Sequence, residues 1–474
     1  VMVTPNNGSV EGSSVLSNNL IIGNNAPNDP SPNLVSTDSL NVTSSDLNCS
    51  SLVSDPDGDN LNVSVRWYKD NVLNTTINYN NNYANATTFS SILDSGNTSS
   101  GETWNCSVRV YDGTDYSSWV NSSGLSVSGN SFDTQWNTSE SGISGSDSVS
   151  LPLYNGGSYD FVVNWGDGNV GYVTAWDDVD KNHTYSSSGV YNVSIAGTIV
   201  GFRFDNGGDR LKLYDISQWG VLNVGNNNGY FYGCENLVGT FSDTLNLSGT
   251  TNLYGIFRNC FNFTGNVSGW DVSGVNGMSG MFQSAYSFDG DLSSWDTSAA
   301  TSMNWMFAYS NFSGDISSWD VSGVNGMQGM FAVANNFNGS LSSWNVSGVN
   351  DMSYMFSGAE NFDGNISSWN VSNVTNMDRM FFGAYDFSGD LSSWDVFNVT
   401  SMWQMFRNAD SFNSNISSWD VSNVGNMVQM FYSADSFDQD LGDWNVSNVT
   451  NMTEMFGGIG LSTANYDSLL SGWA

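Results

Sequence analysis

The chain has 474 residues, which is enough for several domains, and it carries 46 acidic against 10 basic side chains, a formal net charge of −36. This balance argues against binding to nucleic acid or to an anionic membrane, because both need basic patches, and it makes divalent cations plausible partners. No apolar run approaches the roughly 20 residues of a membrane span, and an aromatic content of 14% indicates a folded chain.

Several features predict an extracellular, cell-surface location. The chain begins with Val1 rather than Met, which fits a mature secreted protein whose leader was removed. The four cysteines form two well-separated pairs, which fits an oxidising location. Asn-x-Ser/Thr sequons are frequent, and they predict covalently attached glycans. The candidate glycosylation sites are Asn41, Asn74, Asn85, Asn121, Asn246, Asn345, Asn398 and Asn448.

Residues 1–26 are too short and too polar to fold alone. Leu20, Ile21 and Ile22 can form one strand within this N-terminal extension. We expect either the same subunit or a neighbouring one to hold the extension. A strand donated to a neighbouring subunit would be β-augmentation, which makes these three residues interface candidates.

Residues 27–129 contain the order Cys49, Trp67, Cys106, with Trp67 in SVRWYKDN and Cys106 in ETWNCSVRVYDG. This order resembles the immunoglobulin-like (Ig-like) modules that are common in archaeal and bacterial secreted proteins. The resemblance implies a β-sandwich with Trp67 in its core and a disulfide between the two cysteines.

The segment SDPDGDN places Asp55, Asp57 and Asp59 at alternating positions around Gly58. Clustered carboxylates are the ligands that Ca²⁺ prefers, so one hypothesis is a calcium loop. The alternative is an Asp/Gly turn between two strands, which this composition favours more strongly.

Residues 130–200 contain NWGDGN and HTYSSSGVYNVSI, which resemble the PKD-type β-sandwich. The only histidine of the chain, His183, occupies the H-T-Y position, where we expect a structural role. No Ser/His/Asp or Cys/His constellation, phosphate loop or zinc spacing is evident, so we expect no enzyme and no cofactor other than Ca²⁺. The module runs directly into the next segment, which indicates a rigid junction.

Residues 201–474 contain a repeat of 25 residues. A tryptophan recurs at intervals of 24 or 25 residues, and twelve residues later a phenylalanine follows a methionine. The tryptophans are Trp270, Trp295, Trp319, Trp344, Trp369, Trp394, Trp419 and Trp444. Trp219 and Leu245 extend the pattern backwards, which gives about ten coils. Such a period predicts a solenoid, in which L-S-S-W-D-V forms a strand of a parallel sheet and M-x-x-M-F a short helical turn.

The M-F-x-x-A and L-x-x-W-D-V-S segments closely resemble the BspA-type surface-protein repeats, which are related to leucine-rich repeats. The resemblance implies cell-surface display and adhesion without catalysis, and it identifies ANYDSLLSGWA as a C-terminal helical cap. The predicted fold class is therefore all-β and multidomain: an Ig-like sandwich, a PKD-like sandwich, and a leucine-rich-repeat-like solenoid.

Cys234 and Cys260 both lie three residues after the repeat phenylalanine, in a slot that elsewhere holds alanine. Adjacent coils would stack these positions within disulfide reach, so we predict a bridge between them. The alternative is two small buried thiols.

Two columns of acidic and amide side chains accompany the repeat tryptophans, one directly after them and one four residues before. Carboxylates stacked on neighbouring coils repel one another, and Ca²⁺ would relieve the repulsion. The candidate ligands are Asp291, Asp296, Asp315 and Asp320. The alternative, which we favour, is that these side chains cap local turns.

Breaks in the repeat mark candidate interface residues. Phe397 replaces the serine of W-D-V-S, and Trp305 and Trp403 interrupt the M-x-x-M turns. Arg379 and Arg407 are rare cations in an acidic segment. Exposed aromatic and arginine side chains often anchor interfaces, although ordinary repeat drift explains them equally well.

Three functions follow as hypotheses. The first is a structural subunit that assembles with copies of itself into an extracellular filament or surface layer. The second is an adhesin that presents the solenoid to a protein or glycan ligand. The third, which ranks last, is a secreted carbohydrate-active enzyme, because acidic pairs are frequent along the chain.

Overall fold

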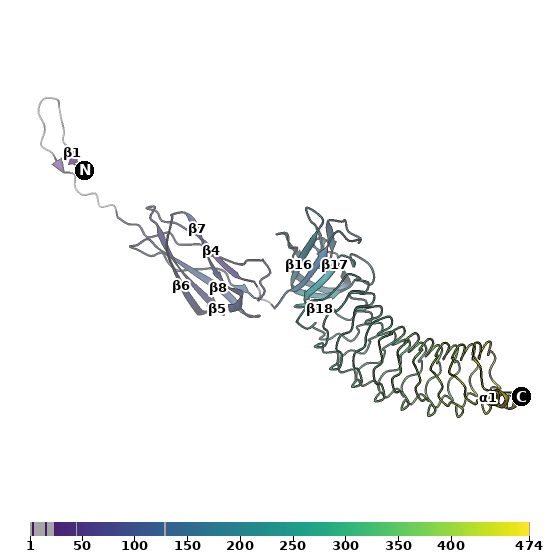
Figure 1. Ribbon diagram of the computed structural model, residues 1–474. Helices are drawn as coiled ribbons and strands as arrows, with labels where there is room; N and C mark the ends of the chain where they lie inside the picture. The colour runs from purple at the N-terminus through teal and green to yellow at the C-terminus, as the bar shows by residue number, and fades with distance from the viewer. Residues whose placement is uncertain (1, 4–14, 17–22, 44, 128, 474) are drawn as a thin grey trace. The chain divides into compact units, whose positions relative to one another are not determined.

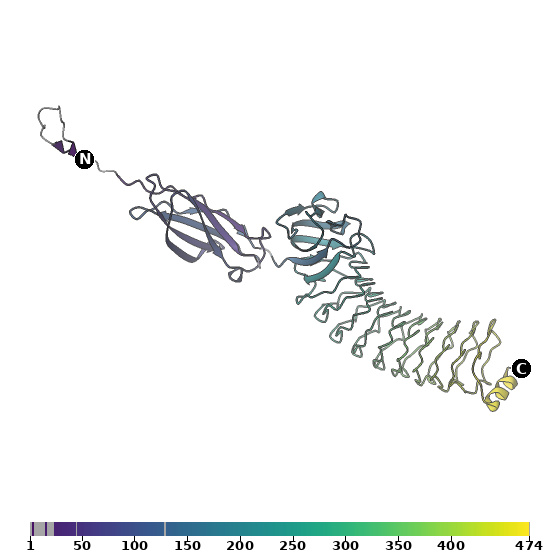
Figure 2. The ribbon, with the colours of Figure 1, turned by 45° about the horizontal axis from the view of Figure 1, so that its top comes forward.

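The computed structural model describes the whole chain except residues 1, 4–14, 17–22, 44, 128 and 474. The architecture is nearly all-β, and it divides into two compact units, Val1–Gly129 and Asn130–Ala474 (Figures 1 and 2). No described helix has the length and apolar character that a membrane span requires.

The described residues of the first unit form ten strands and one 3₁₀ turn. They are β1 (Met2–Val3), β2 (Val15–Leu16), β3 (Asn33–Ser36), β4 (Leu47–Val53), β5 (Leu61–Lys69), β6 (Val72–Tyr83), β7 (Thr87–Leu93), η1 (Ser95–Asn97), β8 (Thr103–Tyr111), β9 (Val120–Asn121) and β10 (Leu125–Ser126). Strands β1 and β2 pair with each other in antiparallel fashion. The interface candidates Leu20, Ile21 and Ile22 lie outside the described residues.

Two antiparallel sheets build the body of the first unit. One has the order β10-β8-β5-β6 with β9 beside β8, and the other has the order β3-β4-β7. Alternate residues of β4, β5 and β8 are buried, because successive side chains of a strand point to opposite faces. Trp67 is fully buried among them, and a disulfide joins Cys49 of β4 to Cys106 of β8. The bridge therefore ties the two sheets together through their shared core.

Glu102, just before β8, holds a charge at the edge of this core. Its carboxylate accepts hydrogen bonds from Lys69 Nζ, from Trp104 Nε1 at 2.9 Å and from the Ser99 N–H at 2.9 Å. The bond from Lys69 is the main reason that the pKa of Glu102 falls from 4.5 to about 2, although burial acts against it. A carboxyl whose pKa is depressed by folding stabilises the folded state above its unfolded pKa and loses that contribution as pH falls.

We therefore expect Glu102→Gln to lower the unfolding free energy of the first unit at neutral pH, because the variant loses the charged bond to Lys69. The expected loss is about 2 kcal/mol, since solvent partly screens the exposed Lys69. The difference from the wild type should shrink as pH falls from about 4.5 to about 2. Hydrogen exchange of the β8 amides in the full chain, followed across this range, checks the prediction. A difference that does not change with pH would contradict it.

The second unit begins with a further β-structure and ends with one described helix. Its elements are β11 (Phe132–Asn137), β12 (Ser148–Ser150), β13 (Leu153–Asn164), β14 (Val170–Val173), η2 (Val179–Lys181), β15 (Asn182–Thr184), β16 (Val190–Phe202), β17 (Leu213–Gln218), β18 (Leu222–Asn223) and α1 (Thr463–Gly472). A six-stranded sheet has the order β14-β13-β16-β11-β17 with β18 beside β16, and β12 pairs with β15.

Lys212 is fully buried where this β-structure meets the first coil. Its ammonium donates hydrogen bonds to Ser144 Oγ at 2.7 Å and to the Ser148 carbonyl at 2.9 Å, and it lies 4.0 Å from the carboxylate of Asp209. That carboxylate in turn accepts bonds from Ser144 Oγ at 2.6 Å and from the Ser150 N–H at 2.8 Å. Burial lowers the pKa of Lys212. A paired charge is therefore enclosed within the unit.

The β-structure and the coils share one hydrophobic core. It runs without a break from Phe132 in β11 to Met455 in the last coil. Strand β18 pairs in parallel with β16, and Asn223 at its end bridges to Asn246 of the following coil. The coils therefore continue the sheet on which they are built.

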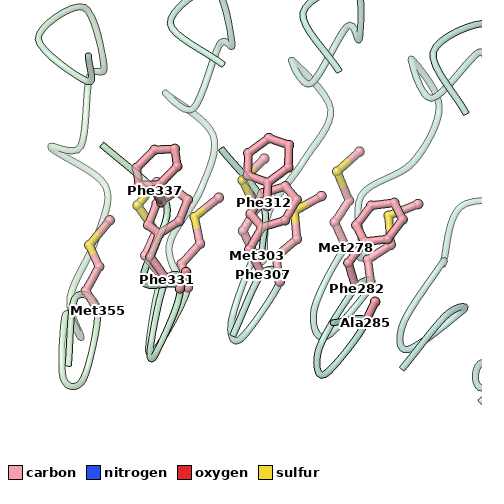
Figure 3. Packing of buried hydrophobic residues seen from close by; sticks show 14 of the residues in the cluster. Met278, Phe282, Ala285, Met303, Phe307, Phe312, Phe331, Phe337 and Met355 are labelled. Atoms are coloured by element: carbon pink, nitrogen blue, oxygen red, sulfur yellow. The ribbon is translucent and has the colours of Figure 1, made fainter. Parts of the chain in front are cut away.

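The repeat forms a stack of coils in which equivalent residues lie above one another. The repeat tryptophans from Trp270 to Trp444 are at most 4% exposed. From Trp295 onwards, each indole N–H donates to a backbone carbonyl of the preceding coil at 3.0–3.3 Å. Phenylalanine rings of neighbouring coils stack with centroids 5.5–5.9 Å apart. Figure 3 shows methionines and phenylalanines of successive coils, among them Met303, Phe307 and Phe312, pointing into this interior.

The parallel sheet that we expected from the coils does not form. From Asn252 to Asn451, each pair of successive coils shares one isolated parallel bridge and no continuous strand. Further backbone N–H groups, such as those of Gly280 and Phe282, donate to the next coil from within turns. The L-S-S-W segment is a turn: the Trp295 N–H donates to the Leu292 carbonyl at 3.2 Å. The preceding Asp291 accepts the N–H of Ser293 at 2.9 Å. This side chain–backbone bonding favours a turn over the strand that the apolar alternation predicted.

Helix α1 covers the last coil, as the family resemblance implied. Ser462 caps its N-terminus by accepting the Asn465 N–H. After the helix, Trp473 occupies the next place in the tryptophan column, because its indole N–H donates to the Leu441 carbonyl at 3.0 Å. Its ring lies 6.3 Å from that of Phe456. The cap thereby encloses the end of the core.

Candidate functional site: the turn face of the coil stack

Each coil contains an eight-residue segment that folds into two reverse turns, and in most coils its sequence is M-x-x-M-F-x-x-A. In one coil the Met380 N–H donates to the Met377 carbonyl at 3.2 Å, and the Ala384 N–H donates to the Phe381 carbonyl at 3.1 Å. Arg379, the third residue of that segment, has a φ of 56°. A positive φ at this point is what type II turns require, and it excludes the short helical turn that we expected. The side chains at the second, third, sixth and seventh positions form a surface that we call the turn face.

The third position has the same left-handed backbone in every coil, with φ between 52° and 67°. The residues are Gly229, Gly255, Gly280, Trp305, Gly329, Tyr354, Arg379, Gln404, Gln429 and Glu454. Glycine takes this conformation freely, whereas other residues incur roughly 1–2 kcal/mol of steric strain. The stack itself supports the conformation, because the N–H at each of these positions from Gly255 to Gln429 donates to a carbonyl of the next coil at 2.8–3.0 Å.

Four of the predicted interface residues lie on this one face. The guanidinium of Arg379 lies 4.1 Å from the ring centroid of Trp403, and that of Arg407 lies 4.8 Å from the ring of Tyr432. The ring of Trp305 lies 5.9 Å from the ring of Tyr354, measured between centroids, and Tyr354 in turn lies beside Arg379. The row, which we call the aromatic–arginine ridge, consists of Trp305, Tyr354, Arg379, Phe382, Trp403, Arg407 and Tyr432.

The two arginines of the ridge are held by aromatic rings and amides. Arg379 Nε donates to Gln404 Oε1 at 2.6 Å, and Arg407 donates to Gln429 Oε1. Among the ion pairs of the described residues, none involves either arginine. Cation–π contacts of this kind contribute about 0.5–2 kcal/mol each. The ridge thus displays two positive charges on a chain with a net charge of −36.

The sequence alone did not reveal the other members of the ridge, Tyr354, Phe382 and Tyr432. A signal for them was present. Glycine recurs at the third position in Gly255, Gly280 and Gly329, which indicates a backbone that disfavours side chains. A bulky residue in that column, such as Tyr354, therefore stands out once the column is recognised.

Phe397 lies on a different part of its coil. It is 47% exposed, its N–H donates to Asp395 at 3.1 Å, and its carbonyl accepts Asn423 Nδ2 at 2.8 Å. It takes no part in the ridge contacts. The structure therefore separates Phe397 from the other four interface candidates of the coils.

The predicted disulfide between Cys234 and Cys260 is wrong. Both cysteines are free thiols and fully buried. The thiol of Cys260 instead donates to the Phe231 carbonyl at 3.1 Å. Burial raises the pKa of both thiols. The two sulfurs therefore fill the small-residue slot of the core, which was the alternative reading of their spacing.

The loop containing Asp55 has the geometry of a turn. Asp55 Oδ1 accepts the Asp57 N–H at 2.7 Å and the Asp59 N–H at 3.4 Å, while the Asp57 carboxylate accepts two bonds from Asn25. In the described part of the chain, no three Asp, Glu, His or Cys side chains gather closely enough to hold a metal ion. Calcium binding thus stays a prediction, which a chelator titration tests.

The acidic columns cap turns. Asp296 Oδ1 accepts the N–H of Ser298 at 3.1 Å and its hydroxyl at 2.7 Å, and Asp315 and Asp320 accept the N–H two residues later at 2.9 Å. These serine bonds lower the pKa of Asp296 and Asp320, and they outweigh the repulsion between the two carboxylates that raises the pKa of Asp320. The carboxylates are therefore tolerated on neighbouring coils.

The candidate glycosylation sites differ in accessibility. Asn41 and Asn85 are half-buried, and the amide of Asn85 holds the Asp55 loop through two bonds of 2.9 Å. The other six candidates are exposed, and they are Asn74, Asn121, Asn246, Asn345, Asn398 and Asn448. Among these six, the Nδ2 groups of Asn398 and Asn448 donate to carbonyls of the preceding coil at 2.7 and 2.6 Å.

His183 lies in the second unit, where its ring stacks on Trp165 with centroids 5.0 Å apart. Its Nε2 lies 2.8 Å from the carboxylate of Asp167. Burial raises the pKa of Asp167, but hydrogen bonds from His183 and Asn169 outweigh burial, so the pKa lies below its ordinary value. The pair is part of the packing around the W-G-D-G turn.

The tandem repeats and the coil stack define a repeat protein, and comparison with known families agrees. The model of a family described as "Mycoplasma protein of unknown function, DUF285" matches residues 203–313, 301–400 and 362–473, together more than half of the chain. The chain therefore belongs to this family. The match is consistent with the BspA-type resemblance of the repeats, and it does not cover residues 27–200. No curated protein matches the chain closely enough to indicate a relative.

Proposed function

We propose that this chain is an extracellular surface protein whose coil stack presents the turn face to a ligand. One observation carries the proposal. Six coils place a bulky or charged side chain at the third position, where the left-handed backbone favours glycine. Strained backbone positions that persist in a fold often serve function, because stability alone would select against them.

The composition of the turn face supports ligand binding. Arginine and aromatic side chains contribute most of the energy at many protein interfaces, and the ridge combines both. The regular, buried core beneath the ridge holds the backbone of these residues in place, so their side chains are positioned for binding. We further propose that the protein is an adhesin without catalytic activity and that it is N-glycosylated at exposed sequons.

The finer fold assignments belong to the same proposal. We assign residues 27–129 to an Ig-like sandwich, which the Cys49–Cys106 bridge between two sheets supports. We assign residues 130–200 to a PKD-like sandwich and 201–474 to a leucine-rich-repeat-like solenoid. The single core running from Phe132 to Met455 supports a rigid junction between these last two.

Self-assembly into a filament or surface layer stays a prediction. The stacked coils, the glycan-ready surface and the N-terminal extension favour it, and Leu20, Ile21 and Ile22 of that extension lie outside the described residues. Electron microscopy of the full chain at high concentration tests it directly, and deletion of residues 1–26 should abolish assembly if the extension donates a strand.

A variant that replaces the six bulky third-position residues with glycine separates binding from stability. The changes are Trp305→Gly, Tyr354→Gly, Arg379→Gly, Gln404→Gly, Gln429→Gly and Glu454→Gly. We expect it to fold with its core intact, because each glycine relieves about 1 kcal/mol of backbone strain against the contacts that it removes. We expect it to lose at least about ten-fold in affinity, since several hot-spot side chains are gone.

The measurement is binding of the immobilised full chain to a panel of acidic and neutral polysaccharides and matrix proteins, with circular dichroism as the control for folding. Equal binding by the folded variant and the wild type would contradict the proposal. A wild type that binds nothing in the panel and forms ordered filaments would favour self-assembly instead.

A further inference from the structure

A pocket of about 460 Å³ opens on the turn face, on the N-terminal side of the ridge. Tyr254 and Arg258 form one wall, and Trp305 and Tyr309 form the opposite wall. Gly280 lies between them, and a Cβ added there would meet only Gln283, at 3.4 Å or more. The pocket therefore exists because glycine holds the third position one coil before the first bulky residue.

The walls and floor combine two kinds of chemistry. Tyr254 is 38% exposed and Tyr309 is 43% exposed, so their aromatic faces are accessible. Amides of Gln283, Asn304 and Gln328 also line the pocket. Aromatic faces pack against apolar C–H surfaces, and amides donate to and accept from hydroxyl groups. A pyranose ring presents both surfaces at once, so this lining suits a saccharide.

Arg258 adds a charge that forms no ion pair with any described residue. Its Nη1 donates to Tyr254 Oη at 3.2 Å, and its guanidinium lies 5.0 Å from the ring centroid of Tyr232. Its Nε is buried without a hydrogen-bond partner in the described structure. No Asp or Glu lines the pocket. The repulsion from the acidic chain is screened beyond about 8 Å at physiological salt, so Arg258 dominates locally.

We infer that this pocket binds an acidic saccharide, with the pyranose against Trp305 and Tyr309 and its carboxylate on Arg258. The inference deepens the proposed function by naming a ligand class, and it rests on the turn face being a binding surface. Guanidinium groups recognise carboxylates through charge-assisted hydrogen bonds, which distinguishes an acidic from a neutral sugar. Uronic acids and sialic acids share this chemistry.

Calorimetric titration of the full chain tests the inference with two matched pairs of probes. Tetragalacturonate is compared with its methyl ester, and 3′-sialyllactose is compared with lactose. We expect at least one carboxylated probe to bind about ten-fold or more tightly than its neutral partner, because hydrogen bonds to charged groups are the stronger ones. Which pair shows the difference distinguishes a uronic from a sialic acid.

Two variants locate the site. Trp305→Gly removes one wall, and Gly280→Gln fills the space with a side chain that the same position carries in Gln404 and Gln429. Both should weaken binding of the carboxylated probe about ten-fold or more. Phe397→Ser, a change outside the turn face to the residue that other coils carry at this position, should leave binding of the probe unchanged. Circular dichroism confirms that each variant is folded.

Failure of the inference can be told apart from failure of the proposed function. If neither carboxylated probe binds, if the neutral partners bind equally well, or if Trp305→Gly and Gly280→Gln bind like the wild type, the acidic-saccharide pocket is overturned. If the six-glycine variant nevertheless loses binding to a matrix protein, the turn face remains a ligand surface of another specificity.

Discussion

Replacing Lys212 with methionine is expected to lower the unfolding free energy of the second unit by about 3–5 kcal/mol, because the change leaves the buried carboxylate of Asp209 without its cation. Lys212 and Asp209 are both 0% exposed, so water cannot compensate for the loss. The methionine side chain has a similar length, so the change creates only a small cavity and loses little stability through packing. Urea unfolding of the full chain measures the effect.

The double variant Lys212→Met with Asp209→Asn is the matched control. The amide oxygen of the asparagine can still accept the Ser144 hydroxyl and the Ser150 N–H, the two bonds that Asp209 Oδ2 accepts. Its NH2 group then faces the Ser144 N–H, which Asp209 Oδ1 accepts in the wild type, so we expect the double variant to recover part of the lost stability. A double variant as unstable as the single one would show that packing around Lys212, rather than the buried charge, is responsible.

Reduction of the Cys49–Cys106 disulfide is expected to destabilise the first unit by about 4 kcal/mol and to leave the second unit unchanged. The bridge closes a loop with a sequence separation of 57, and opening a loop of that size releases entropy to the unfolded chain. Cys234 and Cys260 are already thiols, so the second unit has no bridge to lose. Thermal unfolding with and without reductant compares the two transitions.

Alkylation of the unfolded, unreduced protein provides the control. Mass analysis should find two modified cysteines in the second unit and none in the first. A second-unit transition that also falls with reductant, or an unmodified Cys234, would show that these two cysteines are bridged in solution.

The core of the coil stack could be predicted from the sequence, because its signal is the period itself. Tryptophan, methionine and phenylalanine recur at the same places in each coil, and the structure buries these columns together. The Cys49–Cys106 bridge was likewise implied by the order of Cys49, Trp67 and Cys106. Periodicity and residue order are therefore reliable guides to which side chains are interior.

The local backbone was harder to predict. The spacing of three between methionines such as Met377 and Met380 fits a helical turn, but a positive φ at Arg379 converts it to a type II turn. Apolar spacing carries no information on the sign of φ. The glycines in the same column do carry this information, because glycine adopts a positive φ without steric strain. The serines after Asp291 similarly favoured a turn where the alternation predicted a strand.

The structure groups only some of the interface candidates, and their role at an interface stays a prediction. Breaks in the repeat found Trp305, Arg379, Trp403 and Arg407, which lie on one face, but they also found Phe397, which does not. A break shows that a residue is unusual and does not show which way it points. The pocket beside Trp305 depends on an ordinary repeat residue, Gly280, and no break marks it.

The central claim is that ligand binds the turn face of the coils, and attachment of a bulky group to single cysteines tests it most directly. Val333→Cys places a thiol on the turn face at a position that is 37% exposed, and Phe397→Cys places one elsewhere on the coil at 47% exposure. The buried native thiols, whose pKa values are raised, should not react with a polyethylene glycol maleimide. We expect modification at position 333 to block binding of the panel ligand and modification at position 397 to leave it intact. Binding that survives modification at 333, or is lost only at 397, would contradict the claim.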